Sequence, residues 1–282
     1  MPQRPLIPSL VLSSRANRWL PVTALAEAAH DAGTDGLDLD LTTRPGATLL
    51  GFASGIRVQT GADVAIPSLW LPQVRRFGLN GRRADRFVDE WLGLSARLQL
   101  KQLLVNREPA LRPFGERDKR PLLLRLQEGV GPKTRVTLVL RPTDLEGTRA
   151  HLTTMTSLRR TAEEWDFDLA IDLCGTVDPR WEAEAAIQRI LPRLTLIRLG
   201  ASGGDLAPGS RARLTRRSLA YLLDQSYSGT LSLVPTVPLT AKFSAATLER
   251  GTRNEAQAIV ERHQRIFSSI RASDRLPTSQ QR

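Results

Sequence analysis

The stretch LAIDLCGTVDP, residues 169–179, has the pattern of a buried strand that ends at a loop. Leu169, Ala170 and Ile171 form a continuous apolar run, which is typical of a parallel strand with both faces covered. The run ends on the carboxylate of Asp172, and loop-forming residues follow from Gly175 onward. In α/β proteins, functional groups gather at the C-terminal ends of such strands, so Asp172 is a candidate site residue.

Segments on both sides of this strand alternate between helical and strand-like patterns. We predict strands at 6–14, 36–42, 64–72, 100–106, 135–142, 169–175, 194–200 and 230–235. We predict helices at 21–33, 84–98, 120–129, 145–165, 179–191, 211–225 and 244–270. Eight strands alternating with helices favour a single (β/α)₈ TIM barrel over a doubly wound open sheet.

The barrel is expected to be one domain that covers residues 1–270, because no linker-like segment divides the chain. Residues 271–282, RASDRLPTSQQR, are polar, and we predict that they form a disordered tail. No segment approaches the roughly 18 uninterrupted apolar residues of a membrane span. A secretory signal pattern is lacking, and the single cysteine, Cys174, excludes an internal disulfide. These features predict a cytoplasmic protein without a membrane anchor.

The net charge of +11 raises the possibility of nucleic-acid binding. The basic residues, which are mostly arginine, are spread along the whole chain, and aromatic residues make up only 5% of it. Surfaces on which nucleotide bases could stack are therefore scarce. Nucleic acid is the less favoured partner.

Candidate site residues follow from the barrel prediction, because barrel chemistry lies at the C-terminal strand ends. The candidates are Asp38 and Asp172 as catalytic carboxylates, and Arg15, Trp70, Asn106, Arg107, Arg141 and Arg198 as substrate-binding residues. The three histidines, His30, His151 and His263, all fall on predicted helices. We therefore expect neither a histidine base nor a histidine-containing metal site.

Several strand motifs resemble those of the xylose isomerase-like TIM barrels. AGTDGLDLDL (32–41) is similar to the AGFDGVEL helix–strand junction of that superfamily. Similar matches follow, in the same order along the chain, at TLVLRP (137–142), DLAIDLCGTVDP (168–179), LPRLTLIRL (191–199) and SYSGTLSLV (226–234). The superfamily includes sugar phosphate isomerases and epimerases and AP endonuclease family 2. If the protein is an enzyme, the resemblance implies an isomerase or epimerase that acts on a carbohydrate derivative.

The resemblance also implies a metal site, whose ligands come from strands five to eight of the family barrel. The matching positions here are Arg141, Asp172, Arg198 and Val234, so only one of the four ligands is retained. Asp38 occupies a strand-two position where relatives have glutamate. Arginine keeps its positive charge at working pH and repels a dication. We therefore expect no metal and no other cofactor.

The substitution of arginines for metal ligands predicts a site for anions. We expect a barrel like the sugar phosphate isomerases and epimerases, which binds a small anionic metabolite such as a sugar phosphate or an organic acid. Catalysis is expected to be metal-independent or lost. In the most specific form of this hypothesis, Arg141 and Arg198 hold the anion together and Asp172 lies between them. Two alternatives remain open: the aspartates simply neutralise the arginines, or the protein is a nucleic-acid-binding or regulatory pseudoenzyme related to AP endonuclease family 2.

Overall fold

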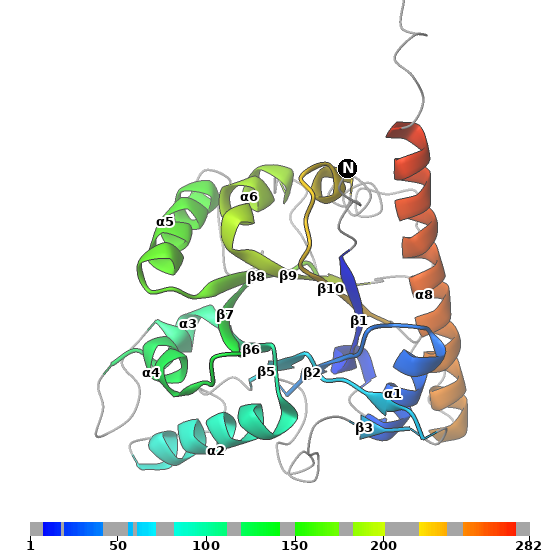
Figure 1. The fold of residues 1–282 in the computed structure, drawn as a ribbon, viewed down its shortest axis with the longest axis horizontal. Helices are drawn as coiled ribbons and strands as arrows, with labels where there is room; N and C mark the ends of the chain where they lie inside the picture. The colour runs from blue at the N-terminus through cyan, green and yellow to red at the C-terminus, as the bar shows by residue number, and fades with distance from the viewer. Residues whose placement is uncertain are drawn as a thin grey trace, which may run out of the picture.

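Eight parallel strands close into a barrel in the computed structural model (Figure 1). The barrel strands are β1 (Ser9–Ser13), β2 (Leu37–Asp40), β5 (Ser68–Trp70), β6 (Gln102–Asn106), β7 (Arg135–Leu140), β8 (Asp168–Asp172), β9 (Leu194–Gly200) and β10 (Thr230–Val234). Their order around the barrel is β1-β10-β9-β8-β7-β6-β5-β2. The structure describes residues 8–17, 20–41, 56–58, 61–71, 82–111, 120–141, 150–174, 183–200, 220–235 and 245–274. The predicted (β/α)₈ fold is confirmed.

Helices surround the strands (Figure 1). They are α1 (Val22–Asp31), α2 (Arg82–Leu98), α3 (Arg107–Ala110), α4 (Leu122–Gly129), α5 (Ala150–Glu164), α6 (Ala183–Ile190) and α8 (Ala245–Asp274), with short 3-10 turns η1 (Ser14–Asn17) and η5 (Leu191–Arg193). The long C-terminal helix α8 packs against α1, the first α-helix of the chain. No helix in the described ranges is long and apolar enough to cross a membrane.

Two boundaries differ from the sequence-based expectations. The strand predicted at 64–72 is confined to Ser68–Trp70, and Val64 instead pairs with Ile56 in a small antiparallel hairpin of β3 (Ile56–Arg57) and β4 (Asp63–Val64). Pro67 lies between β4 and β5, and proline has no N–H to donate to a ladder of strand hydrogen bonds. At the C-terminus, α8 continues to Asp274, past residue 270, where the last helix was expected to end. The rest of the predicted tail, 275–282, lies outside the described residues.

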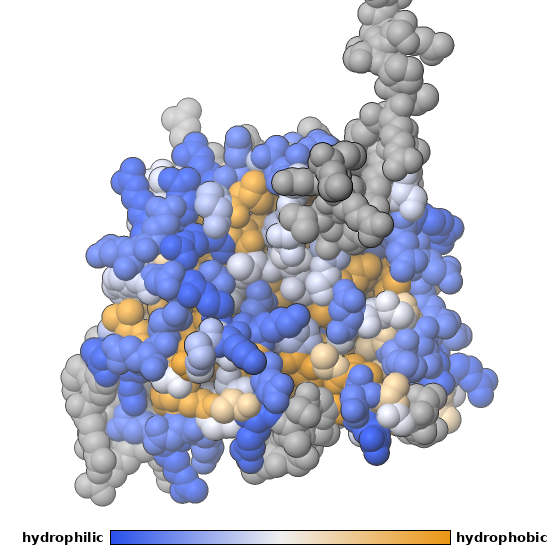
Figure 2. Space-filling model, viewed as in Figure 1, coloured by the Kyte–Doolittle hydropathy of each residue, from blue (hydrophilic) through white to orange (hydrophobic). Residues whose placement is uncertain are grey.

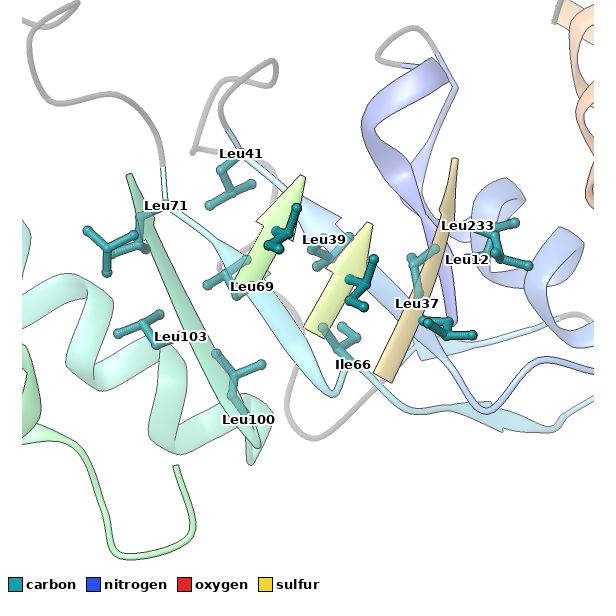
Figure 3. Packing of buried hydrophobic residues seen from close by; sticks show 14 of the residues in the cluster. Leu12, Leu37, Leu39, Leu41, Ile66, Leu69, Leu71, Leu100, Leu103 and Leu233 are labelled. Carbon is teal, nitrogen blue, oxygen red and sulfur yellow. The ribbon is translucent and has the colours of Figure 1, made fainter. Parts of the chain in front are cut away.

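Side chains alternate between the outside and the inside of the barrel, because the side-chain period of a strand is two residues. Leucines such as Leu12, Leu37 and Leu69 point outward and pack in the layer between strands and helices (Figure 3). A separate apolar cluster inside the barrel is formed by Trp70, Leu104, Val139, Ala170 and Leu196. The register places Trp70 beside Leu104, and Ala170 beside both Val139 and Leu196.

Candidate functional site: an ion-pair cluster at the barrel mouth

The sequence Leu-Asp-Leu-Asp of β2 places two carboxylates inside the barrel. Leu37 and Leu39 face the outer layer, so Asp38 and Asp40 face inward, and both side chains are fully buried. A buried carboxylate is costly unless it is paired and hydrogen-bonded. Asp38 accepts hydrogen bonds from two hydroxyls, at 2.8 Å from Ser68 on the neighbouring strand β5 and at 2.6 Å from Ser232 on β10, on the far side of β1.

The guanidinium of Arg198 neutralises part of this negative charge. Arg198 lies on β9 and reaches across the barrel interior to β2, where its Nε donates to Asp38 Oδ2 at 3.1 Å. Its other nitrogens contact the same Asp38 oxygen and Asp40 Oδ2, the latter at 2.7 Å. The Arg198 side chain is only 1% exposed. These three residues, which we call the inner triad, combine one positive and two negative charges.

Asp172 forms a second group of ion pairs, closer to solvent. Its Oδ2 contacts Arg15, which lies in η1 directly after β1, and lies 3.7 Å from Nε of Arg141, which follows β7. Its Oδ1 accepts a hydrogen bond from the backbone amide of Cys174 at 3.0 Å. Asp172 is 1% exposed, whereas the side chains of Arg15 and Arg141 are 25% and 19% exposed. This outer triad combines two positive charges and one negative charge.

Trp70 lies in contact with both triads. The guanidinium carbon of Arg198 lies 4.0 Å from the centroid of the indole ring, and those of Arg141 and Arg15 lie at 5.0 and 5.7 Å. Cations within about 6 Å of an indole face are attracted by its quadrupole. Trp70 is itself buried, and its Nε1 has no hydrogen-bond acceptor among the described residues. The ring therefore forms a shared contact surface for three guanidiniums and carries one unpaired donor.

Burial and charge shift the pKa values of two groups beside the aspartates. Burial acts to lower the pKa of the Arg198 guanidinium, but the carboxylates of Asp38, Asp40 and Asp172 raise it, and the net shift is upward. Arg198 therefore remains a fixed cation. Burial, assisted by the charge of Asp172, raises the pKa of the Cys174 thiol well above its ordinary value. Since the thiolate is the nucleophilic form, Cys174 is poorly suited to act as a nucleophile.

Six of the eight residues predicted from the sequence lie together in this cluster: Arg15, Asp38, Trp70, Arg141, Asp172 and Arg198. The contacts that define the cluster do not involve the other two, Asn106 and Arg107, which lie at the end of β6 and the start of α3. Sequence reasoning gave no role to Asp40, Ser68 and Ser232. The sequence signal for Asp40 was its position two residues after Asp38, which places both side chains on the same face of β2.

The expected arrangement of Asp172 between Arg141 and Arg198 is wrong in one respect. Asp172 and Arg198 are register partners on β8 and β9, but the ion pairs of Arg198 are with Asp38 and Asp40. The long arginine side chain extends across the barrel because two buried carboxylates on β2 attract it more strongly than one that already contacts two arginines. Arg15 takes the place beside Asp172 that we had expected for Arg198.

The residues at the barrel mouth do not fit the divalent cation that the family resemblance implies. The carboxylates of Asp38 and Asp40 face the guanidinium of Arg198, and the carboxylate of Asp172 faces two further guanidiniums. A dication would have to displace these fixed cations or lie beside them. Within the described parts of the chain, no group of three or more His, Cys, Asp or Glu side chains is arranged to hold a metal ion.

No protein-family model and no curated protein sequence matches the chain. Solved structures with a similar fold include an uncharacterised protein from Parabacteroides distasonis ATCC 8503, with a TM-score of 0.50 and 8% identity over 88% of this chain and 97% of that one. Another is xylanase 10B of Clostridium thermocellum, with a TM-score of 0.50 and 8% identity over 91% of this chain and 66% of that one. A xylose isomerase domain-containing protein from Salmonella typhimurium LT2 has a TM-score of 0.43 and 12% identity, covering 89% of this chain and 96% of that one.

At these identities the likeness establishes the shared barrel fold, which hosts many unrelated activities. The function has to be argued from the residues at the barrel mouth.

Proposed function

We propose that the protein binds a small anionic metabolite at the C-terminal mouth of the barrel, without a metal ion, through Arg15 and Arg141. One observation carries this proposal: two partly exposed guanidiniums share a single buried carboxylate, Asp172. Within the outer triad, guanidiniums outnumber carboxylates by two to one, at the end of the barrel where ligands bind in this fold. Guanidinium groups are well suited to hold carboxylates and phosphates.

Arg198 has a different role in this proposal from the one that the sequence suggested. Its side chain is buried, and its nitrogens are engaged by Asp38 and Asp40. It acts as an internal cation that pairs with two buried aspartates. In this proposal the ligand contacts Arg15 and Arg141, because their side chains reach solvent.

Binding is favoured over catalysis because Asp38 and Asp172, two carboxylates that the structure describes at the mouth, are already engaged. Both oxygens of Asp172 accept contacts, one from Cys174 and one from the arginines. Both oxygens of Asp38 accept hydrogen bonds as well. A general base needs a free lone pair within reach of the substrate proton. The proposed function is thus that of a sugar isomerase-like barrel whose ancestral catalysis has been lost while ligand binding persists.

The distribution of the other arginines supports a small ligand over a nucleic acid. Several of the described arginines outside the barrel mouth form ion pairs with nearby acidic residues, as in the pairs Arg86–Glu90 and Arg120–Glu128. Arg125 pairs with Asp85 in the same way. The face drawn in Figure 2 is largely hydrophilic, as expected for a strongly charged chain. Three arginines converge on Trp70 at the barrel mouth, which is the pattern expected of a small-anion site.

Isothermal titration of the parent protein with sugar phosphates, sugar acids and inorganic phosphate tests this proposal. The double variant Arg15→Gln, Arg141→Gln keeps hydrogen-bonding groups beside Asp172 but removes both charges. A hydrogen bond to a charged group contributes about 1.5–3 kcal/mol, so each arginine should account for roughly a 10- to 100-fold change in Kd. Arg135→Gln is the matched control, because Arg135 begins the strand that Arg141 follows, at the opposite end of the barrel. Equal affinities of the parent and the double variant for every anion would refute the proposal.

A further inference from the structure

Polar residues precede the members of the apolar cluster inside the barrel along four adjacent strands, β5 to β8. Inward-facing positions recur every second residue of a strand, so the residue two positions before each cluster member also faces inward. Before Trp70, Leu104, Val139 and Ala170 of the cluster, these positions are occupied by Ser68, Gln102, Thr137 and Asp168, which we call the polar layer. The connections that lead into these strands, 61–67, 98–101, 130–134 and 165–167, are all among the described residues.

Two members of the polar layer carry buried atoms without a partner. Thr137 is fully buried, and its Oγ1 has no hydrogen-bond partner among the described residues. The side-chain nitrogen of Gln102 donates to the carbonyl oxygen of Thr195 at 3.5 Å, whereas Gln102 Oε1 is buried and has no partner in the same part of the chain. Thr195 is the extra residue at an irregularity of β9, where Leu194 and Leu196 pair with consecutive residues of β8, and its Oγ1 is also buried without a partner. Polar atoms on three strands therefore share this condition at the N-terminal end of the barrel.

Such atoms are unfavourable inside a protein unless they form hydrogen bonds. Native proteins satisfy almost all of them with protein groups or with ordered water. An ordered internal water molecule typically bonds to two or more polar groups that the protein leaves unpaired. We infer that ordered water binds inside the barrel, at Thr137 Oγ1 and Gln102 Oε1. This inference goes beyond the anion site proposed at the barrel mouth and does not depend on it.

The chemistry of the polar layer suits water. Gln102 Oε1 can only accept hydrogen bonds, whereas the hydroxyl of Thr137 can both donate and accept. A water molecule supplies donors and acceptors together, so it can satisfy both groups. Ser68 and Thr137 have small side chains, which leave more room inside the barrel than the apolar residues that follow them. An ion is a less suitable occupant, because Asp168, the charged member of the layer, already contacts Arg135 at 3.5 Å.

Thr137→Val separates a hydroxyl that binds water from one that has no partner, because the two cases predict opposite changes in stability. The substitution keeps the shape of the side chain and removes the hydroxyl. Removal of a hydroxyl without a partner would relieve a buried polar group and stabilise the protein. Removal of a hydroxyl that binds water loses a hydrogen bond, so we expect the unfolding equilibrium constant, measured by urea unfolding, to rise by about fivefold.

Thr134→Val is the matched control. Thr134 is also buried and lies directly before β7, but its Oγ1 donates to the carbonyl oxygen of Leu100 at 2.7 Å. Its replacement should destabilise the protein by a similar factor without changing the internal water. Oxygen-17 magnetic relaxation dispersion detects water molecules that stay in a protein for longer than its tumbling time. We expect Thr137→Val to lose part of the signal of the parent protein, and Thr134→Val to retain all of it.

Each outcome decides the inference. A Thr137→Val variant that is as stable as the parent, or more stable, would show that the hydroxyl binds no water. A destabilised Thr137→Val variant with the full signal of the parent would place the internal water elsewhere, and a parent without any signal would exclude it, so both results overturn the inference. If Thr137→Val fails to fold, Gln102→Met takes its place, with the same loss of signal expected because methionine lacks the amide oxygen.

Discussion

Arginines and aspartates form networks at both ends of the barrel, and the two networks differ in burial. At the mouth, the side chains of Asp38, Asp40 and Arg198 are at most 1% exposed. At the opposite end, Arg135 contacts Asp166 at 2.9 Å and Asp168 at 3.5 Å. We call these three residues, together with Arg193, which also contacts Asp166 at 2.9 Å, the base network. Asp166 is 63% exposed and Arg135 is 36% exposed.

An ion pair between arginine and aspartate is expected to contribute differently to stability at the two ends of the barrel, because the two networks differ in burial. Exposed ion pairs contribute little to stability, because water and salt screen them and long side chains lose entropy. Removing one partner of a buried pair leaves an uncompensated charge in a poorly solvated site. We therefore expect the stability of the protein to depend strongly on the inner triad, less on the outer triad and weakly on the base network.

The largest effect is expected for Arg198→Ala. The substitution removes the cation that both Asp38 and Asp40 contact, and breaking a buried pair in this way costs about 3–5 kcal/mol. Urea unfolding followed by circular dichroism measures the change in the free energy of unfolding. Arg135→Ala is the control, with an expected cost of about 1 kcal/mol or less. Similar losses of unfolding free energy in Arg198→Ala and Arg135→Ala would contradict the expected difference between the inner triad and the base network.

A smaller effect is expected for Asp172→Asn. Arg15 and Arg141 lose their shared carboxylate, but both can turn toward water because their side chains are partly exposed. Asparagine can still accept the hydrogen bond from the amide of Cys174. The expected cost is about 1–3 kcal/mol, the range for a lost charged hydrogen bond. The same unfolding measurement applies, and a loss as large as that of Arg198→Ala would show that the outer triad is less solvated than its exposure indicates.

The smallest effect is expected in the base network, where it should depend on pH. Hydrogen bonds from Arg135, and then from Arg193, hold the pKa of Asp166 below its ordinary value. A carboxylate with a depressed folded-state pKa stabilises the protein above its unfolded pKa of about 3.9 and loses this contribution as the pH falls further. Asp166→Asn should therefore cost about 1 kcal/mol or less at pH 7, and its difference from the parent should shrink at pH 3.

Asp168→Asn provides a control of opposite sign for the pH experiment. Burial raises the pKa of Asp168, although Arg135 acts to lower it. A carboxyl group with a raised folded-state pKa favours the folded state when it is protonated, so the parent gains stability relative to Asp168→Asn as the pH falls. Parallel pH trends for the two variants would contradict the assigned causes.

The fold was largely predictable because its signals are local. The eight strands and most helices follow from apolar runs and from the spacing of leucines, as in Leu37 and Leu39 on β2. The β3–β4 hairpin was missed because each of its strands is only two residues long, too short to show a period. The extent of α8 was underestimated because polar residues can continue a helix without the apolar period that marks it in the sequence.

The candidate site was predictable in its members and less so in its contacts. Strand-end positions placed Arg15, Asp38 and Asp172 at one end of the barrel, since parallel strands all end on the same side. The partner of Arg198 was predicted wrongly because Asp172, on the adjacent strand β8, was expected to pair with it. In the barrel the contacting residue, Asp40, is 158 positions away in the chain.

The sequence by itself determined the barrel, the placement of Asp38 and Asp40 on one face of β2, and the presence of Arg141 and Arg198 at strand ends. Each of these follows from local periodicity or from the identity of a residue. Only the tertiary structure decided which charged side chains form ion pairs. Closure of the barrel brings β9 close enough to β2 for the Arg198 side chain to contact Asp38 and Asp40. It also decided that Arg198 is buried while Arg15 and Arg141 remain partly exposed. Exposure depends on the depth at which a side chain lies in the closed barrel, and no local pattern records that depth.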